Sequence, residues 1–168
     1  MQADSVVLIP TYNEIENIEK IILAVLELPK AFHVLIIDDG SPDGTAAAVK
    51  NMMQRYPEQI FILERQGKQG LGTAYICGFK WAIEHQYEYI FEMDADFSHN
   101  PKDLLRLYAA CAEQGASLAI GSRYVSGVNV VNWPIGRVLM SYFASYYVRL
   151  ITGMNIKDTT AGFTGVKC

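Results

Sequence analysis

Two aspartates, Asp94 and Asp96, stand one residue apart at the end of a run (87–94) that is typical of a buried strand. In extended chain the side chains of residues i and i+2 point the same way, so both carboxylates can share one ligand. Carboxylate oxygens suit Mg²⁺ or Mn²⁺, and either cation can bridge to phosphates. A lone D-x-D pair is more often a solvated loop, so the metal interpretation depends on its surroundings.

The same stretch does not fit an EF-hand calcium loop. Asp94, Asp96 and Ser98 match its first, third and fifth positions. His99, however, stands where glycine is required, and Leu105 stands where the bidentate glutamate belongs. The calcium-loop interpretation is therefore excluded.

Further acidic residues follow the second hydrophobic run, in the stretch IIDDGSPDGT (36–45). Asp38 and Asp39 stand at a strand end, where acids commonly accept hydrogen bonds from ribose hydroxyls or base N–H groups. The alternative is that Asp38 only shapes the turn. For Asp43 we favour a structural role as a helix cap.

Cationic residues near these acids are candidates for phosphate binding. Lys68 lies in GKQGLG (67–72), which is no P-loop because Gln69 follows the lysine. The stretch either closes a tight turn or brings Lys68 to an anion. Arg123 and Arg137 are candidates for bidentate phosphate contacts, although single arginines more often form surface ion pairs.

The histidines and cysteines offer little chemistry. His33, His85 and His99 have no metal-ligand spacing, and only His99, beside the two acids, is placed to touch a ligand. Cys77, Cys111 and Cys168 form no C-x-x-C pair and no recognisable nucleophile motif. These thiols are typical of a reduced, cytoplasmic protein.

The elements that must position these residues alternate along the chain. Expected strands cover 5–10, 32–39, 59–65, 87–94 and 116–124. Expected helices lie between them; Asn13 is the predicted cap of the first, 70–85 is the third, and Asn100 with Pro101 begins the fourth. This alternation predicts an α/β fold with a mostly parallel, doubly wound sheet flanked by helices. Ligands bind such sheets at the carboxyl ends of the strands, where nearly all the unusual residues fall.

The chain beyond residue 125 has a different pattern. A loop is expected first, then a helix from about Ile135 to Ile151. One face of this helix is apolar and aromatic, and for most of its members we favour packing on the sheet over contact with a lipid surface. Its members are Leu139, Tyr142, Phe143, Tyr146, Tyr147 and Leu150. The final FTGVKC resembles the start of a strand, so we expect a single domain, 1–168, cut short at its C-terminal side.

Bulk properties narrow the class of protein. The 168 residues are 51% hydrophobic and 19% charged, which is ordinary for a soluble globular domain. A net charge of −4 gives no support for nucleic-acid binding. The N-terminus lacks the features of a signal peptide, and no window reaches the length of a membrane span. A cytoplasmic location is expected, with peripheral contact at the cytoplasmic membrane face still open.

Six stretches occur together in an order and spacing that resemble a known family. They are VVLIPTYNEIENI, IIDDGSPDGT, GKQGLGTAYICGF, MDADFSHNP, GSRYVSGV and NWPIGRVLMS. The chain resembles family 2 glycosyltransferases and, within them, the polyprenyl-phosphate (dolichol-phosphate) mannosyltransferases. The resemblance covers essentially the whole chain, and the stretch from Arg123 through Arg137 to DTTAGF is its most specific part.

This resemblance implies a GT-A (nucleotide-diphospho-sugar transferase) fold. Pro10, Tyr12 and Glu14 are expected to line the nucleotide, with Asp39, and its neighbour Asp38, as candidates for its base or ribose.

The remaining site residues follow from the same resemblance. Asp94 and Asp96 are expected to hold Mg²⁺ or Mn²⁺, with Ser98 as a third oxygen ligand. Arg123 and Arg137 are expected to hold donor or acceptor phosphates with help from Lys68. Asp158 and TAGF (160–163) are expected near the acceptor.

The implied reaction is an inverting transfer of mannose from GDP-mannose to polyprenyl phosphate. A phosphate acceptor is already ionised, which would explain why the sequence shows no strong general base. Transfer from another nucleotide-sugar, such as a UDP-glucose type, or to a glycan hydroxyl remains an alternative. A nucleotide-binding module without catalysis is a third possibility.

Overall fold

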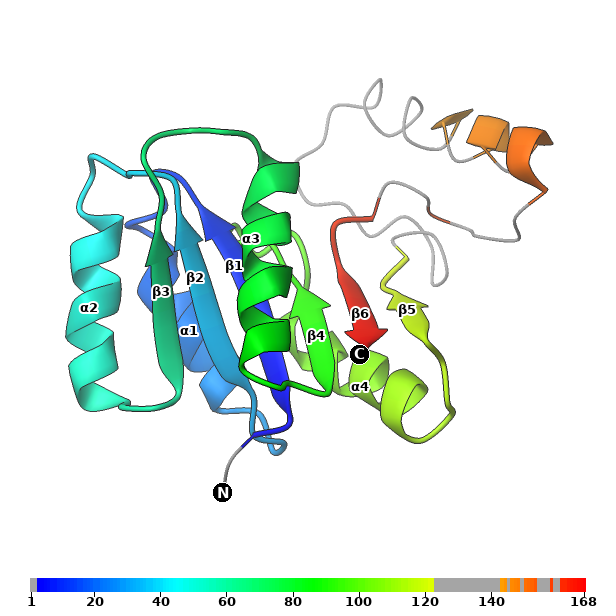
Figure 1. Cartoon of the computed structure of the whole chain (residues 1–168), viewed down its shortest axis with the longest axis horizontal. Helices are drawn as coiled ribbons and strands as arrows, with labels where there is room; N and C mark the ends of the chain where they lie inside the picture. The colour runs from blue at the N-terminus through cyan, green and yellow to red at the C-terminus, as the bar shows by residue number, and fades with distance from the viewer. Residues whose placement is uncertain (1–2, 123–142, 145, 149, 154–157, 159–160) are drawn as a thin grey trace.

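The computed structural model describes residues 3–122, 143–144, 146–148, 150–153, 158 and 161–168. Within them, a six-stranded sheet has the order β3-β2-β1-β4-β6-β5. Its strands are β1 (Ser5–Thr11), β2 (His33–Asp38), β3 (Ile60–Glu64), β4 (Tyr89–Glu92), β5 (Leu118–Ile120) and β6 (Thr164–Lys167). Strands β1 to β4 are parallel, so their carboxyl ends share one edge, at the top of Figure 1.

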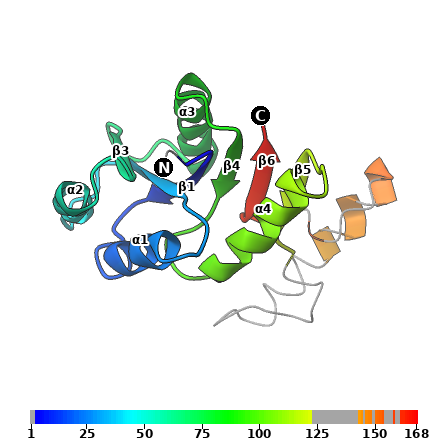
Figure 2. The same cartoon turned by 90° about the horizontal axis from the view of Figure 1, so that it is seen from below.

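Helices cover both faces of this sheet. They are α1 (Ile18–Leu26), α2 (Thr45–Arg55), α3 (Leu71–Glu84), the short 3₁₀ turn η1 (Pro101–Asp103) and α4 (Leu104–Ala112). Figure 2 shows α3 on one side of the sheet, and α1 and α4 on the other. The two layers form because successive strand residues point to opposite faces.

The alternation is visible in the buried residues of β1. Val7 and Ile9 belong to the core beneath α1, α2 and α4, whereas Val6 and Leu8 belong to the core beneath α3. Because helices cover both faces of the sheet, the sequence of β1 is a continuous apolar run, as is typical of buried parallel strands. The predicted α/β class and mostly parallel sheet are confirmed.

Strand β6 confirms the strand expected at FTGVKC, and it occupies an interior position. It pairs antiparallel with β4 on one side and with β5 on the other. Gly165 allows this position, because a Cβ there would lie 2.6 Å from the buried Phe91 ring.

Two helix starts test the expected caps. Asn100 is confirmed, since its side chain accepts a hydrogen bond from the Lys102 backbone N–H ahead of Pro101. The predicted cap at Asn13 is wrong. Asn13 has a φ of 60°, and α1 begins only at Ile18 with Asn17 as its cap residue. The reason is local, because the Glu14 carbonyl accepts the backbone N–H groups of Asn17 and Ile18.

The aromatic helix near residue 145 is described only in part. Residues 143–144, 146–148 and 150–152 are helical, whereas Leu139 and Tyr142 lie outside the described residues. Phe143, Tyr146, Tyr147 and Leu150 are each 57–72% exposed, so the expected packing on the sheet is wrong for these four. Among the described residues, the structure contains no helix with the length and apolar character needed to cross a bilayer.

Candidate functional site

A small cavity at the carboxyl ends of β1 and β2 gathers residues predicted to bind a nucleotide. Pro10, Tyr12, Asp39 and Lys68 all line it, and its volume is about 120 Å³. Its remaining lining residues are Thr11, Gly70, Leu71 and Ala74. Loops that are far apart in the sequence thus meet at one place, as expected for a parallel sheet.

Lys68 and Tyr12 form one side of this cavity. The Lys68 ammonium nitrogen lies 4.8 Å from the centre of the Tyr12 ring, within range of a cation–π interaction. This contact holds the lysine charge at the mouth of the cavity. The glycines beside it, Gly67 and Gly70, have positive φ values of 75° and 96°, so the loop needs residues without a Cβ.

Asp39 is held by a residue that the motif analysis did not single out, Arg65. Arg65 Nε donates to Asp39 Oδ1 at 2.6 Å, and Nη2 donates to Oδ2 at 2.8 Å. Both side chains are less than 10% exposed. The hydrogen bonds to Asp39 raise the pKa of Arg65. Its position directly after β3, just before the GKQGLG loop, is the sequence feature that could have indicated it.

Arg65 also reaches the start of α3. Its guanidinium donates to Thr73 Oγ1 at 2.8 Å and to the Gly70 carbonyl at 3.3 Å. One side chain therefore ties the end of β2 to the loop that carries Lys68.

Asp38 has a different environment from Asp39. Its carboxylate is buried and accepts hydrogen bonds from Thr11 Oγ1 (3.0 Å) and from the Ser41 N–H (2.9 Å) and hydroxyl (2.6 Å). These contacts are those of an acid that shapes the turn, the alternative raised for this residue. Its predicted contact with a nucleotide stays a prediction.

Glu14 and Asp43 lie where two loops are joined. The Glu14 backbone N–H donates to Thr45 Oγ1, and the Ile15 N–H donates to the Asp43 carboxylate, both at 3.0 Å. Asp43 also accepts from the Thr45 N–H at 3.0 Å, but Gly44 is the cap residue of α2. Asp43 therefore has a structural role, as expected, but it stands one residue before the cap position of α2 and is not the cap itself. Glu14 is not among the residues that line the small cavity.

The D-x-D pair lies at the end of β4, the neighbour of β1. The intervening Ala95 is buried in the core, whereas Asp94 is half-buried and Asp96 is exposed. Asp96 Oδ1 accepts the Ser98 backbone N–H at 2.9 Å, across Phe97 with a φ of 58°. The two acids thus face away from the core, and a tight local turn holds the second.

These residues suit a divalent cation that shares its coordination with a ligand. The oxygens of Asp94, Asp96 and Ser98 are hard donors of the kind that Mg²⁺ and Mn²⁺ prefer. Among the described residues, no group of three or more His, Cys, Asp or Glu could hold a metal alone. Mg²⁺ bound by one or two carboxylates takes its remaining oxygens from water and substrate phosphates. The donor set therefore fits the expected cation.

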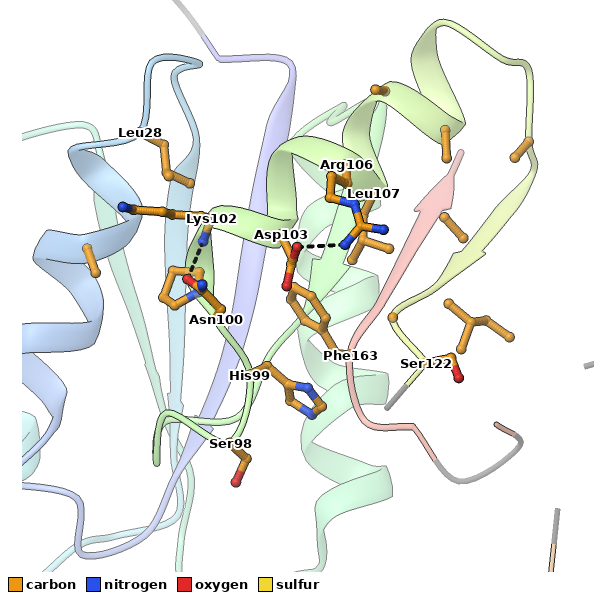
Figure 3. A pocket seen from close by; sticks show the side chains of 18 of the residues that line it. Leu28, Ser98, His99, Asn100, Lys102, Asp103, Arg106, Leu107, Ser122 and Phe163 are labelled. Carbon is orange, nitrogen blue, oxygen red and sulfur yellow. Dashed lines mark hydrogen bonds and ion pairs between the residues drawn. The ribbon is translucent and has the colours of Figure 1, made fainter. Parts of the chain in front are cut away.

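A second, much larger cavity of about 1420 Å³ runs along α4 from the D-x-D loop to β5. Ser98 and His99 line it where it meets the loop, and Ser122 and Phe163 border it on the side of β5 and β6 (Figure 3). His99 stacks on Phe163 with ring centres 5.0 Å apart. Ser98 therefore faces this cavity rather than the small one. Arg123 and Arg137 lie outside the described residues.

Comparison with known proteins gives this geometry its context. A family model described as glycosyl transferase family 2 matches residues 6–168. The chain belongs to glycosyl transferase family 2. The family predicted from its motifs is therefore confirmed.

Two curated members of this family are close in sequence. The polyprenol monophosphomannose synthase of Mycolicibacterium smegmatis is 45% identical over 159 residues, which are 95% of this chain and 60% of that protein. The undecaprenyl-phosphate mannosyltransferase of Micrococcus luteus is 43% identical over 156 residues, which are 93% of this chain and 63% of that protein. The chain thus spans less than two thirds of the length of these relatives.

A solved structure supports the fold. Glucosyl-3-phosphoglycerate synthase from Mycobacterium tuberculosis, in complex with Mn²⁺, UDP and glucosyl-3-phosphoglycerate, matches with a TM-score of 0.68 at 16% identity. The match covers 97% of this chain and 56% of that one. It confirms the GT-A fold expected from the sequence.

Proposed function

We propose that this chain is the catalytic domain of a metal-dependent, inverting glycosyltransferase that moves mannose from GDP-mannose to a polyprenyl phosphate. The observation that carries the proposal is the convergence of Pro10, Tyr12, Asp39 and Lys68 on one cavity, with the D-x-D pair at the neighbouring strand end. The names of the two curated relatives support mannose as the sugar and a polyprenyl phosphate as the acceptor.

The donor nucleotide is expected to enter the small cavity with its base or ribose. At about 120 Å³ the cavity is smaller than the ~300–1,000 Å³ typical of small-molecule sites, so it can hold only part of a nucleotide-sugar. The remainder must lie along the sheet edge, toward Asp94 and Asp96. Lys68, at the mouth of the cavity, is placed to attract the diphosphate between these two regions.

Asp94 and Asp96 would hold Mg²⁺ or Mn²⁺, with the Ser98 hydroxyl as a candidate third oxygen. When bound, such a cation neutralises the charge that develops on the leaving nucleoside diphosphate. Arg123 and Arg137 remain the predicted contacts to donor or acceptor phosphates.

The acceptor phosphate needs no strong base, because it is ionised at neutral pH and can attack the anomeric carbon directly. A single in-line displacement inverts that carbon and gives a β-linked product from an α-linked donor. This chemistry requires the chain to position two anions and to neutralise charge.

The test uses the full-length protein and screens GDP- and UDP-sugars for Mn²⁺- or Mg²⁺-dependent transfer to polyprenyl phosphate. We expect transfer from GDP-mannose, with loss of metal-dependent GDP binding in Asp94→Asn and Asp96→Asn. Asp103→Asn is the matched control, because this aspartate on η1 forms an exposed ion pair with Arg106.

Other outcomes would select one of the alternatives. Transfer to a sugar hydroxyl but not to the lipid would replace the proposed acceptor, and activity only with UDP-sugars would replace the donor. If nucleotide affinity is the same with and without divalent cations, and is unchanged in both aspartate variants, a non-catalytic nucleotide-binding module would be favoured.

A further inference from the structure

The Lys68 ammonium group covers a part of the small cavity that a nucleotide would need. It lies 4.8 Å from the centre of the Tyr12 ring, and both side chains line the cavity. Tyr12 is nevertheless 40% exposed. An accessible aromatic ring at a nucleotide site is a surface on which a base can stack. The ammonium group and a base cannot occupy the same face of this ring together.

The size of the cavity agrees with this competition. At about 120 Å³ it is well below the ~300–1,000 Å³ typical of small-molecule sites. One of its walls is fixed, because Ala74 is buried in the core beneath α3. Lys68 and Leu71, which also line it, are exposed. A swing of the lysine side chain can therefore enlarge the cavity without disturbing the core.

The backbone on both sides of Lys68 is held by hydrogen bonds, so the movement belongs to its side chain. Before it, the backbone N–H of Arg65 donates to the Asp38 carbonyl at 2.8 Å. After it, the backbone N–H of Gln69 donates to Asp39 Oδ2 at 3.4 Å. A lysine side chain has a flexible stem of four carbons between the backbone and its charge. The ammonium group can thus leave the ring while the loop keeps its shape.

The contact that covers the ring is weak enough to be exchanged. A cation–π contact at an exposed site changes an equilibrium constant by about two- to fivefold. A hydrogen bond from an ammonium group to a phosphate oxygen is stronger, because both groups are charged. A ligand with phosphate groups can therefore draw Lys68 away from Tyr12. A ligand without them must displace the ammonium group and offers it no phosphate in exchange.

We propose that Lys68 is a selectivity residue, which covers the Tyr12 ring in the free protein and uncovers it for a base when a phosphate of the same ligand binds the ammonium group. The inference rests on the proposed function, in which the donor diphosphate lies near Lys68. The lysine then favours nucleotides in two ways, because it attracts their phosphates and competes with a base that arrives without them. The site thus discriminates against free nucleosides.

The test measures the binding of guanosine and of GDP to Lys68→Ala in the full-length protein, by calorimetric titration in the presence of Mg²⁺. Alanine removes the ammonium group and the stem that holds it over the ring. We expect the affinity for guanosine to rise about two- to fivefold, because the base no longer competes with a cation–π contact. The affinity for GDP should fall at least about fivefold, because a charged hydrogen bond to phosphate is lost.

Lys80→Ala is the matched control. Lys80 is an exposed lysine further along α3, and its loss changes the net charge of the protein by the same amount. We expect it to leave both affinities unchanged.

Variants of Tyr12 test whether the ring is the surface that the lysine covers. In the Tyr12→Leu background the ring is absent, so the addition of Lys68→Ala should no longer raise the affinity for guanosine. In the Tyr12→Phe background the ring remains, and the rise should persist.

The possible results separate the inference from the proposed function. If Lys68→Ala binds guanosine as the parent does and loses only GDP affinity, the lysine merely attracts phosphate; the inference is wrong and the proposed function stands. A fall in both affinities would assign Lys68 a structural role at the cavity and also overturn the inference. A rise for guanosine that persists in Tyr12→Leu would overturn the role of the ring. If the parent binds neither guanosine nor GDP, the proposed donor is wrong and the inference fails with it.

Discussion

Arg65 joins two parts of the candidate nucleotide site that the sequence motifs treat separately. Its guanidinium holds both oxygens of Asp39 and also contacts Thr73 and the Gly70 carbonyl. Each carboxylate oxygen has two lone pairs, so Asp39 keeps acceptor capacity for a base or ribose while Arg65 holds it. The ion pair therefore orients Asp39 without excluding its predicted role.

Arg65→Lys should weaken GDP binding by about tenfold and reduce the free energy of unfolding. Lysine keeps the charge but cannot form two parallel hydrogen bonds to a carboxylate. Breaking a buried pair costs up to ~3–5 kcal/mol, and retention of the charge should keep the loss below that. Calorimetric titration with GDP and urea denaturation would measure the two effects.

Arg55→Lys is the control for this substitution. Arg55 lies near the Tyr56 ring at the end of α2, at the edge of the sheet opposite to the cavity loops (Figure 1). It should leave GDP affinity unchanged. Equal GDP affinity in the parent and in Arg65→Lys would contradict the positioning role of Arg65.

Residue types made Asp39 and Lys68 candidates for the site, and the resemblance to family 2 glycosyltransferases added Pro10 and Tyr12. Pro10, Tyr12, Asp39 and Lys68 meet as expected, because strand ends of a parallel sheet converge whatever the loops contain. Arg65 escaped notice because a single arginine after a strand has no distinguishing pattern.

At the scale of elements, local patterns predicted which segments form strands and helices but not which strands are neighbours. The apolar runs of β1 to β4 are continuous because helices cover both faces of the sheet. FTGVKC also indicated a strand. Its insertion between β4 and β5 depends on contacts such as that of Gly165 with Phe91, which no local pattern encodes.

Gly165→Ala should destabilise the fold by about 1–3 kcal/mol, because an added Cβ would overlap the buried Phe91 ring. Urea denaturation would measure the change. Gly72→Ala is the control, since a Cβ at this helical position meets no atom within 4 Å and alanine favours a helix. If Gly165→Ala unfolds at the same urea concentration as the parent, β6 can shift without loss of stability.

The helical segment around Tyr146 should contact lipid surfaces, because Phe143, Tyr146 and Tyr147 are each 57–63% exposed. Replacing all three by serine should weaken binding to phosphatidylglycerol vesicles at least tenfold, since each buried aromatic side chain contributes ~1.5–3 kcal/mol. Vesicle co-sedimentation would measure the loss.

A second exposed apolar pair provides the control. Ile76 and Ile83 on α3 are 55% and 60% exposed, and their replacement by serine should leave vesicle binding unchanged. Equal losses in both variants would indicate non-specific adsorption instead of contact through the aromatic segment.

At the scale of the whole molecule, Asp4 links the beginning of the sheet to two distant parts of the chain. It pairs with Lys30 at 2.6 Å and accepts a hydrogen bond from Tyr108 at 3.1 Å. Burial alone would raise the pKa of Asp4, but hydrogen bonds from Lys30 and Ser5 outweigh it and lower the pKa below the ordinary 3.8.

This lowered pKa predicts acid sensitivity of the fold. Because the carboxylate is favoured in the folded state, its contribution is present above the unfolded pKa of 3.8 and is lost as the pH falls through the lower folded value. The part-exposed pair should contribute no more than about 1 kcal/mol at neutral pH.

Asp4→Asn should therefore be less stable than the parent at pH 7, and the difference should shrink below pH 4. Melting temperatures recorded between pH 3 and pH 7 would measure it. A difference that stays constant with pH would mean that the charge of Asp4 does not act through this pair.

The interior place of β6 also has a consequence for biosynthesis. Residues 121–163 must leave the ribosome after β5 and before β6, the strand that joins β5 to the sheet. Until then a nascent chain has β4 as an open edge, and the backbone of Gly162 cannot yet approach Asp94. The nucleotide cavity can form early during translation, whereas the acidic site can be completed only after β6 has been made.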